Sequence, residues 1–387
     1  MDIFETDKKY VAGTYARFPV EIVRGKGSLC YDGAGKEYVD MGAGIAVNIF
    51  GFCDEEWIAA VEKQLHAFQH TSNLYYQAPC ARLAEALCKR TGMKKVFFSN
   101  SGAEANECAI KAARLYAAEN KGEEYYNVIT LKGSFHGRTL TTLAATGQEV
   151  FHKYFQPLTP GFLYAQPNNA ESVKKLIDGH KVAAVMLEPV LGEGGVIPLE
   201  QSFVKEVFEY ASENGVLTIV DEVQTGNGRT GALYGYMNFG VLPDIVTTAK
   251  GLGGGLPIGA TMLGEKVKNV FSAGMHGSTF GGNPVAAAGA LSVINRLTDK
   301  LLSEVREKSA YIKTRLKNMK GVKGVTGTGL ILGVETDMPA GDAVLKCIEG
   351  GALFLTAKNK IRLLPALNIS YELLDRALSV LEKVLEG

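Results

Sequence analysis

Two charged residues, Asp221 and Lys250, each stand at the end of an apolar run. Asp221 closes the run Val216–Val220, and Lys250 follows Ile245–Thr248 after a single alanine. Such runs are typical of buried parallel strands, whose carboxyl ends share one edge of the sheet, where ligands of open α/β folds bind. A strand-end charge on its own is usually only solvated. Together, the amine and the carboxylate suit pyridoxal phosphate, which needs a lysine that bonds to its aldehyde and an acid that keeps its ring nitrogen protonated.

A candidate phosphate site lies in the segment Ser99–Asn106, which follows the apolar run Val96–Phe98 and opens a helical pattern. Ser101 offers a hydroxyl, and Gly102 lets the backbone approach a ligand closely. The free N–H groups and the dipole of the first helical turn would stabilise a phosphate. From this segment alone, the favoured interpretation is an ordinary helix capped by a serine, because such caps are common. Both interpretations stay open at this point.

The segment Gly133–Thr139 carries an aromatic ring and a guanidinium close together. Phe135 can stack on a planar ring, and Arg138 can bind a carboxylate through two hydrogen bonds. His136 lies between the aromatic residue and a glycine, a setting typical of a packed or hydrogen-bonded histidine. We therefore assign His136 no proton transfer.

Several glycine-rich loops surround these segments. Glu193, in the loop that follows the apolar run Val182–Leu187, is compatible either with an arginine partner in the site or with a solvated carboxylate. The stretches Gly226–Gly231 and Gly251–Gly255 lack the strand and helix context of nucleotide-binding loops, so we interpret both as turns beside the site. The loop His276–Asn283 offers hydroxyls either to an anion or as a cap for the helix that begins at Pro284. No sequence motif for a metal site is present.

The composition excludes several classes of function. The chain has 387 residues, with 41 Lys plus Arg and 41 Asp plus Glu, so no overall field attracts nucleic acid or an anionic membrane. Small molecules are the expected ligands. The six cysteines form no CxxC pair, which is typical of free thiols in a reducing compartment. The amino terminus is charged, and no apolar run reaches membrane length, so we expect a cytoplasmic protein.

Alternating β-rich and helical patterns predict an α/β fold. Short β-rich runs recur from residue 96 to residue 248 with helices between them, as in a mostly parallel sheet covered on both faces. A helix from Asp54 to Phe68 is expected to face the core, and a long helical stretch from Pro284 to Leu316 is expected to break near Thr298. We predict an arm and part of a small domain at 1–50, a large α/β domain at 51–290, and a small α+β domain at 291–387.

Taken in order, these segments resemble the class III, or ω-amino-acid, pyridoxal phosphate aminotransferases of fold type I. The resemblance covers nearly the whole chain and rests on the motifs Asn100–Glu107, Phe135–Arg138, Asp221–Gln224, Gly228–Gly231, Ala249–Gly255 and His276–Thr279. It implies pyridoxal phosphate as cofactor and a homodimer with shared active sites. It also implies a ping-pong transfer of an amino group to 2-oxoglutarate. No partner other than small molecules and a second copy of the chain is expected.

The resemblance also assigns roles to individual residues. Lys250 is the expected Schiff-base lysine and proton carrier, and Asp221 the expected partner of the ring nitrogen. Thr279 is expected to reach the phosphate in the neighbouring subunit, with Ser278 close to the substrate. The cofactor contacts it implies are Ser101, Gly102, Ala103, Phe135, Asp221, Glu222, Val223, Gln224, Lys250 and Thr279. The substrate contacts it implies are Arg138, Glu193, Ser278 and Arg362, with Glu193 covering Arg362 when the donor has no carboxylate near its reacting amine.

The motifs resemble most closely those of family members that use N-acetylornithine in arginine biosynthesis. Other donors remain open, namely succinylornithine, succinyldiaminopimelate, ornithine and 4-aminobutyrate, and so does an aminomutase or racemase on the same scaffold, which would need no keto acid. Two departures from the family pattern bear on the substrate. Leu191 stands where a glutamine is usual, and Gly51–Asp54 reads Gly-Phe-Cys-Asp in place of Gly-His-x-His.

Overall fold

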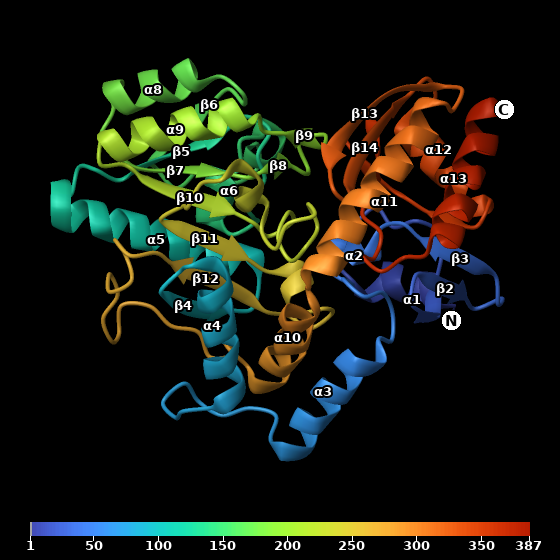
Figure 1. Cartoon of the computed structure of the whole chain (residues 1–387), viewed down its shortest axis with the longest axis horizontal. Helices are drawn as coiled ribbons and strands as arrows, with labels where there is room; N and C mark the ends of the chain where they lie inside the picture. Colours follow the sequence, from blue (N-terminus) through green and yellow to red (C-terminus); the bar gives the residue numbers. More distant parts are fainter. Residues whose placement is uncertain (1) are drawn as a thin grey trace.

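A seven-stranded sheet forms the centre of the molecule in the computed structural model, which describes residues 2–387 (Figure 1). Its strand order is β4-β12-β11-β10-β7-β5-β6, and every neighbouring pair is parallel except the two that involve β12. The prediction of a mostly parallel sheet is therefore confirmed. The strands are β4 (Lys95–Ser99), β5 (Asn127–Leu131), β6 (Phe162–Ala165), β7 (Val182–Leu187), β10 (Leu217–Asp221), β11 (Ile245–Thr248) and β12 (Gly259–Leu263).

Helices cover both faces of this sheet because its central strands are apolar on both sides. On β7, Val185 and Leu187 pack with the helices α8 (Ala170–Gly179) and α9 (Gln201–Glu213), whereas Ala184 and Met186 pack with α5 (Gly102–Lys121). Side chains alternate between the two faces of a strand, so a continuous apolar run is what a doubly covered strand requires.

The carboxyl-terminal part of the chain packs beside the large sheet around a separate antiparallel sheet, β13-β14-β17-β16 (Figure 1). A further sheet, β1-β2-β3-β15, joins the amino-terminal strands to this part through the parallel pair β3 and β15. The domain boundaries at residues 50 and 290 stay a prediction. The strands are β1 (Ile22–Lys26), β2 (Leu29–Asp32), β3 (Glu37–Asp40), β13 (Val322–Thr328), β14 (Ile331–Thr336), β15 (Ala352–Leu353), β16 (Leu355–Ala357) and β17 (Lys360–Leu363).

The expected break in the long helical stretch is confirmed. Thr298 separates α10 (Pro284–Arg296) from α11 (Asp299–Lys317), and its hydroxyl accepts a hydrogen bond from the N–H of Leu301 at 3.3 Å, as a helix cap does. The other helices are α1 (Ile3–Tyr10), α2 (Ala43–Ala46), α3 (Glu55–Ala67), α4 (Ala78–Thr91), α6 (Leu140–Ala145), α7 (Glu149–His152), α12 (Ala340–Glu349) and α13 (Tyr371–Glu386), and a short hairpin joins β8 (Val190–Leu191) to β9 (Ile197–Pro198).

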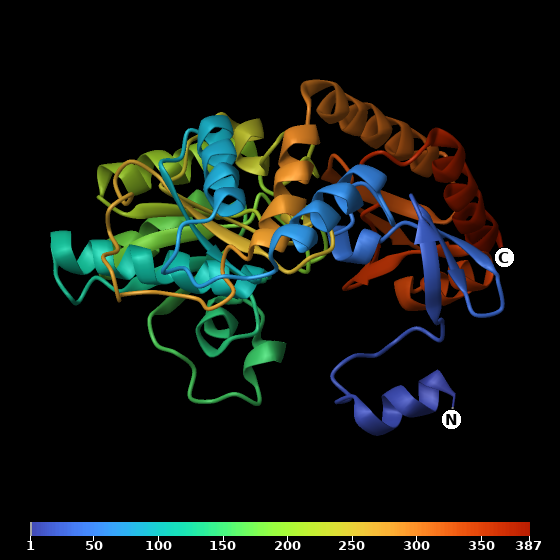
Figure 2. The ribbon, with the colours of Figure 1, turned by 90° about the horizontal axis from the view of Figure 1, so that it is seen from below.

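The prediction that the helix following Asp54 faces the core is confirmed at Trp57, which packs against the core cluster, but not at Leu65 and Phe68, which are exposed. Asp54 caps α3 as expected, accepting from the N–H of Trp57 at 2.9 Å, but no residue of α3 is buried. Trp57 and Val61 approach α10 at Gly289, while Leu65 stays exposed. α1 likewise has no buried residue, and it stands away from the rest of the molecule (Figure 2). No helix within residues 2–387 combines the length and apolarity that crossing a membrane requires.

Candidate active site

A cavity of about 420 Å³ opens at the carboxyl ends of β4, β10 and β11. Asp221 is the last residue of β10 and pairs with Thr247 of β11, while Lys250 follows the end of β11. The parallel register therefore brings Asp221 and Lys250 to one edge, as the sequence predicts. The predicted site residues that line the cavity are Ser101, Gly102, Ala103, Phe135, Arg138, Asp221, Val223, Gln224 and Lys250.

The Asp221 carboxylate is buried and held by three hydrogen bonds. Its Oδ2 accepts from Asn106 Nδ2 at 2.7 Å and from His136 Nδ1 at 2.8 Å, and its Oδ1 accepts from the N–H of Val223 at 2.9 Å. Because an ionised carboxylate only accepts, the Nδ1 of His136 carries the proton. Asn106 is itself fixed, since its Oδ1 accepts from the Thr247 hydroxyl at 2.7 Å. These contacts occupy Oδ2 and leave a lone pair of Oδ1 free for a donor in the cavity.

Lys250 has an unusual backbone and an unusual charge environment. Its φ is +44°, in the left-handed region, which costs a residue other than glycine roughly 1–3 kcal/mol and is found mainly at functional sites. The amide of Asn227 fixes the chain just before it, donating to Thr248 Oγ1 at 3.0 Å and to the Ala249 carbonyl at 3.3 Å. Burial lowers the pKa of the Lys250 amine, in opposition to the nearby carboxylates. A lowered pKa makes a neutral, nucleophilic amine easier to reach.

The amino terminus of α5 also lines the cavity. Ser101 caps this helix, accepting from the N–H of Glu104 at 3.2 Å, so the interpretation as a capped helix is correct. The cap leaves the N–H groups of Gly102 and Ala103 without an acceptor among residues 2–387, and both residues line the cavity. A Cβ at Gly102 would lie 2.7 Å from Val223 Cγ1, so only glycine lets the helix start this close to β10. The start of α5 can therefore carry both the serine cap and an anion site.

Phe135 and Arg138 form the mouth of the cavity. The Arg138 guanidinium lies 4.0 Å from the ring centre of Phe151 and 5.5 Å from that of Phe135, and the arginine is exposed. The N–H of Phe135 donates to Glu188 Oε1 at 2.8 Å. Burial, followed by the charge of Asp221, raises the pKa of Glu188 well above its usual value. Glu188 thus holds the backbone of the aromatic residue in place, and its raised pKa works against a second charge beside Asp221.

Arg362 and Glu193 form an ion pair behind Gln224. Arg362 Nη1 donates to Glu193 Oε1 at 2.5 Å and to Gln224 Oε1 at 3.2 Å, while Gln224 Nε2 donates to Glu193 at 3.2 Å. The Arg362 side chain is 4% exposed and that of Glu193 is 29% exposed. Burial alone would raise the pKa of Glu193, but the charge and hydrogen bond of Arg362 outweigh it and lower the pKa. The loop carboxylate is therefore paired with an arginine and is not simply solvated.

The family is decided by a match of the class III aminotransferase model to residues 10–385. This chain belongs to the class III aminotransferases. It is 46% identical to the acetylornithine aminotransferase of Haemophilus ducreyi, over 99% of this chain and 98% of that protein. It is 46% identical to the enzyme of the same name from Aquifex aeolicus, over 97% of this chain and 100% of that protein.

Two solved structures place the fold in the same class. The ornithine aminotransferase of Toxoplasma gondii superposes with a TM-score of 0.95 at 33% identity, covering 99% of this chain and 94% of that chain. The N-acetylornithine aminotransferase of Stenotrophomonas maltophilia has a TM-score of 0.86 at 34% identity, covering 99% and 98%. The chain is thus a pyridoxal phosphate aminotransferase of fold type I, as its motifs indicate.

The cavity of this aminotransferase fits pyridoxal phosphate. The N–H groups of Gly102 and Ala103 offer free donors for a phosphate at a helix start. Across the cavity, Asp221 keeps a free lone pair for a protonated ring nitrogen, and the Lys250 amine has a lowered pKa. An anion site, an acid and a nucleophilic amine are the three groups that this cofactor requires.

Five predicted residues lie outside the cavity lining. Glu193 and Arg362 form the ion pair described above, and the other three are Glu222, Ser278 and Thr279. The Glu222 carboxylate is buried elsewhere, where it accepts from the N–H of Tyr236 at 2.7 Å and from the Thr225 hydroxyl at 2.6 Å. The structure therefore does not bring its side chain to the site. Thr279 is exposed, and Ser278 Oγ accepts from Asn100 Nδ2 at 3.2 Å on the rim, so neither lines the cavity.

The sequence interpretation did not identify Asn106 or Glu188, and it gave His136 no part in the site. A signal existed for two of them. Asn106 follows Gly102 by four residues and so lies on the same face of α5. Glu188 ends the apolar strand β7 as Asp221 ends β10. The contact of His136 with Asp221 depends on the path of a loop, and no pattern in the sequence indicates it.

The two departures from the family pattern affect packing near the site. Asp54 caps α3 and also receives both Nη atoms of Arg296, at 2.5 and 2.9 Å. Leu191 is buried in the apolar cluster under α9 and pairs with Ile197 in the hairpin of β8 and β9. Neither residue lines the cavity.

Proposed function

We propose that this chain transfers the δ-amino group of N-acetylornithine to 2-oxoglutarate, giving N-acetylglutamate 5-semialdehyde and glutamate, and that it serves arginine biosynthesis in the cytoplasm. The proposal is supported by the names of relatives such as those from H. ducreyi and A. aeolicus. Ornithine aminotransferases are also among the structural neighbours, so the donor is the part that needs a direct test.

The observation that carries the proposal is the placement of the two arginines. Arg138 is exposed at the mouth of the cavity, whereas Arg362 is buried behind Gln224 and covered by Glu193. A donor with one carboxylate far from its reacting amine needs only Arg138. A keto acid with a carboxylate at each end needs both arginines. A movable Glu193 lets one site accept both molecules without leaving a buried charge unpaired.

The roles of the residues follow from these positions. When bound, pyridoxal phosphate supplies a ring that withdraws electrons from the carbon bearing the amino group. The Asp221 carboxylate, fixed by Asn106 and His136, would keep a proton on the ring nitrogen of the bound cofactor. Lys250 Nζ takes the proton from the δ-carbon of the donor, a transfer that its lowered pKa favours. The charge on Glu193 holds Arg362 until a second carboxylate replaces it.

A comparison of donors tests the assignment. The specificity constant would be measured for N-acetylornithine, N-succinylornithine, ornithine and 4-aminobutyrate, each with 2-oxoglutarate. We expect N-acetylornithine to lead by at least about tenfold, because its acyl group removes a charge that ornithine would have to bury. A preference for another donor would reassign the substrate. Product formation without any keto acid would instead identify an aminomutase or racemase.

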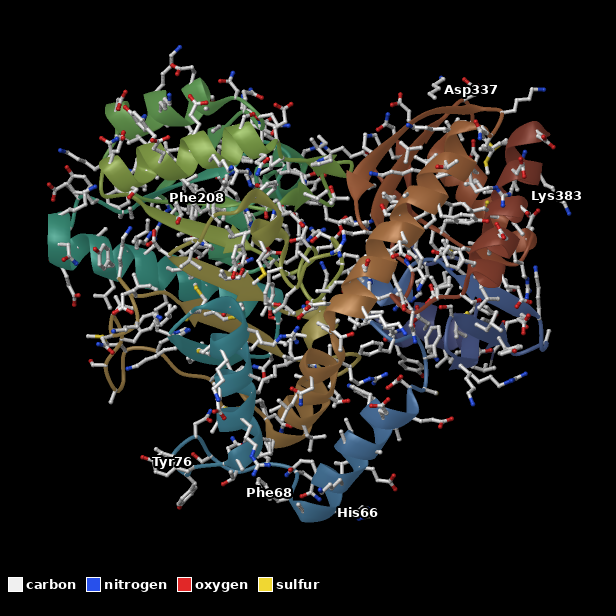
Figure 3. All side chains as sticks on the ribbon, in the orientation of Figure 1. His66, Phe68, Tyr76, Phe208, Asp337 and Lys383 are labelled. Atoms are coloured by element: carbon white, nitrogen blue, oxygen red, sulfur yellow. The ribbon has the colours of Figure 1, made fainter. Side chains whose placement is uncertain are left out.

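We also propose that the active unit is a homodimer in which Thr279 completes the site of the neighbouring subunit. Thr279 is exposed and outside its own cavity, and the nearby segment between α3 and α4 exposes large aromatic residues. Figure 3 shows Phe68 and Tyr76 there, at the edge of the molecule and away from the central sheet. Such exposed apolar surface is typical of a contact with another chain.

Mixing two inactive variants tests this arrangement. Lys250→Ala and Thr279→Ala homodimers should each be impaired, whereas a mixed dimer has one site with both changes and one site with neither. Activity should therefore recover toward half of the wild-type value per dimer after subunit exchange. If Thr279 serves its own subunit, both sites of the mixed dimer are damaged and no recovery occurs.

A further inference from the structure

The turn Gly226–Gly231 holds the most deeply buried arginine of the site region. The Arg229 side chain has no solvent exposure, and its Nη1 donates to the carbonyls of Pro365 and, at 3.1 Å, of Leu330. In return, the carbonyl of Arg229 accepts from the N–H of Leu330 at 2.8 Å. The turn expected beside the site therefore bonds directly to the carboxyl-terminal part of the chain.

The two carbonyls that Arg229 contacts flank β14 and the strand that carries Arg362, β17. Leu330 immediately precedes β14, and Pro365 lies just beyond the end of β17. These strands are neighbours, and Arg362 of β17 pairs with Gly333 of β14. One guanidinium thus joins the ends of both strands, three residues beyond Arg362.

The other side of the same turn is fixed to the cofactor edge of the large sheet. Asn227 holds Thr248 and Ala249, the two residues before Lys250. The turn also follows Gln224, which contacts Arg362. This turn, together with the contact between Gln224 and Arg362, therefore fixes the distance between Lys250 and Arg362.

The turn and the strand ends pack closely against each other. Gly329 has φ +57°, and a Cβ there would lie 2.3 Å from the carbonyl oxygen of Arg229. A Cβ on Gly228 would lie 2.8 Å from Leu367 Cδ1. Side chains at these positions would push the turn away from the strand ends, so glycine is needed on both sides of the contact.

Arg229 is an expensive way to fill this space if stability is its only purpose. Burial lowers its pKa to about 9, so it is still charged at neutral pH. Within residues 2–387, its Nε and Nη2 have no hydrogen-bond partner. The charge of Asp40 raises the pKa of Arg229, but by less than burial lowers it. An apolar side chain of similar volume would often stabilise such a position as well or better. What the arginine adds is a fixed connection to two carbonyls at once.

We propose that Arg229 is a positioning residue that sets where Arg362 stands relative to Lys250, and so determines how well the site binds the α-carboxylate of the keto acid. The inference rests on the proposed role of Arg362. It predicts an effect on the half-reactions in which a carboxylate lies next to the reacting carbon. It predicts little effect on the donor half-reaction, in which Glu193 covers Arg362.

Single-turnover kinetics of the holoenzyme separate the two halves. Arg229→Lys and Arg229→Met would be compared with wild type, following the cofactor absorbance with N-acetylornithine alone and with glutamate alone. We expect the specificity constant for glutamate, and that for 2-oxoglutarate in the reverse direction, to fall about 10- to 100-fold in Arg229→Met, as a displacement near 1 Å produces. The donor half-reaction should change less than about threefold. Arg229→Lys, which keeps the charge and one donor nitrogen but loses the planar fork, should recover part of the loss.

A matched control comes from the same turn. Arg306 of α11 also donates to a carbonyl of this turn, that of Gly231, but it does not reach β14 or β17. Arg306→Met should therefore leave the ratio of the two half-reactions unchanged, even if it lowers the melting temperature.

Each outcome decides the matter. Equal losses in both half-reactions, or no loss in either, would overturn the proposal, as would an Arg306→Met variant that shows the same split. If Arg229→Met does not retain cofactor, the ratio of the two half-reaction constants in Arg229→Lys is the test. If wild type reacts with glutamate but not with N-acetylornithine, the proposed donor fails, and the glutamate reaction with Arg229→Lys still tests the positioning of Arg362.

Discussion

Replacing Glu193 by glutamine should reverse the balance between the two substrates of this aminotransferase. The change keeps the shape of the side chain and a carbonyl that accepts from Arg362, but it removes the charge that neutralises the guanidinium. Arg362 is 4% exposed, so its charge would then face an uncharged stretch of the donor in a site that excludes most water. The donor half-reaction should suffer, whereas a carboxylate next to the reacting carbon should find Arg362 free.

The size of the effect follows from burial. Removing one partner of a fully buried ion pair costs about 3–5 kcal/mol. The Glu193 side chain is 29% exposed, and Gln224 Oε1 still accepts from Arg362 at 3.2 Å, so solvent and this amide recover part of that cost. We expect a loss of roughly 1.4–2.8 kcal/mol, which is about 10- to 100-fold in the specificity constant for N-acetylornithine. The constant for glutamate should stay equal or rise.

The assay mixes the holoenzyme with each amino donor alone and follows the cofactor absorbance in a stopped-flow instrument. Glu193→Asp serves as the control, because it keeps the charge and shortens the side chain by one methylene, and it should retain more of the donor reaction than Glu193→Gln does. The reasoning is refuted if Glu193→Gln slows the reactions of glutamate and N-acetylornithine by the same factor. It is also refuted if Glu193→Asp and Glu193→Gln behave alike.

Three further results are expected. Lys250→Ala should still bind pyridoxal phosphate through the phosphate end of the cavity yet lose nearly all turnover, and substantial transamination by the cofactor-loaded variant would contradict the assignment. Burial raises the pKa of Glu222 from 4.5 to about 7. The stability that depends on the Glu222 proton is therefore fully present below the pKa of Glu222 in the unfolded chain, and it is lost as the pH rises through about 7. The loss is at most roughly 3 kcal/mol. Glu222→Gln should flatten the fall in melting temperature between about pH 5 and 8, and an unchanged slope would argue against a neutral, buried carboxyl. Asp54→Ala loses both the cap of α3 and the pair with Arg296 and should destabilise by about 2–3 kcal/mol, whereas Asp54→Asn keeps the cap and should cost roughly 1 kcal/mol less. Equal unfolding midpoints for the two Asp54 variants in a urea titration would show that the cap contributes nothing.

The sequence could predict those parts of the site that one strand end or one helix start determines. Asp221 and Lys250 each end a run of apolar residues, and parallel strands bring such ends together whatever the rest of the fold does. The same signal was available for Glu188. That signal is weak by itself, because an acid after an apolar run is far more often solvated than functional.

Contacts between distant segments could not be predicted from local patterns. Arg362 and Glu193 came from the family resemblance, and the proximity of Arg362 to Gln224 depends on how β17 packs against the large sheet. The strand β12 was missed because it follows the glycine-rich stretch Gly251–Gly255, which reads as a loop, and contains the small residues Gly259 and Ala260. The exposure of Leu65 on α3 could not be predicted either, because apolar periodicity identifies a face of the helix and not how far along the helix that face is covered.

The antiparallel direction of β12 has a consequence for the motion of the reactive amine. Because β12 runs back against β11, the connecting residues 249–258 leave and re-enter the sheet at the same edge, and both arms of this hairpin are hydrogen-bonded to neighbouring strands. The ladders hold both ends of the segment, at Thr248 and Gly259, and the amide of Asn227 holds the Ala249 carbonyl next to Lys250. Whatever travel Nζ needs between holding the cofactor and collecting a proton must therefore come from torsions along its own methylene stem. Inserting residues into the hairpin should cost activity long before it costs folding.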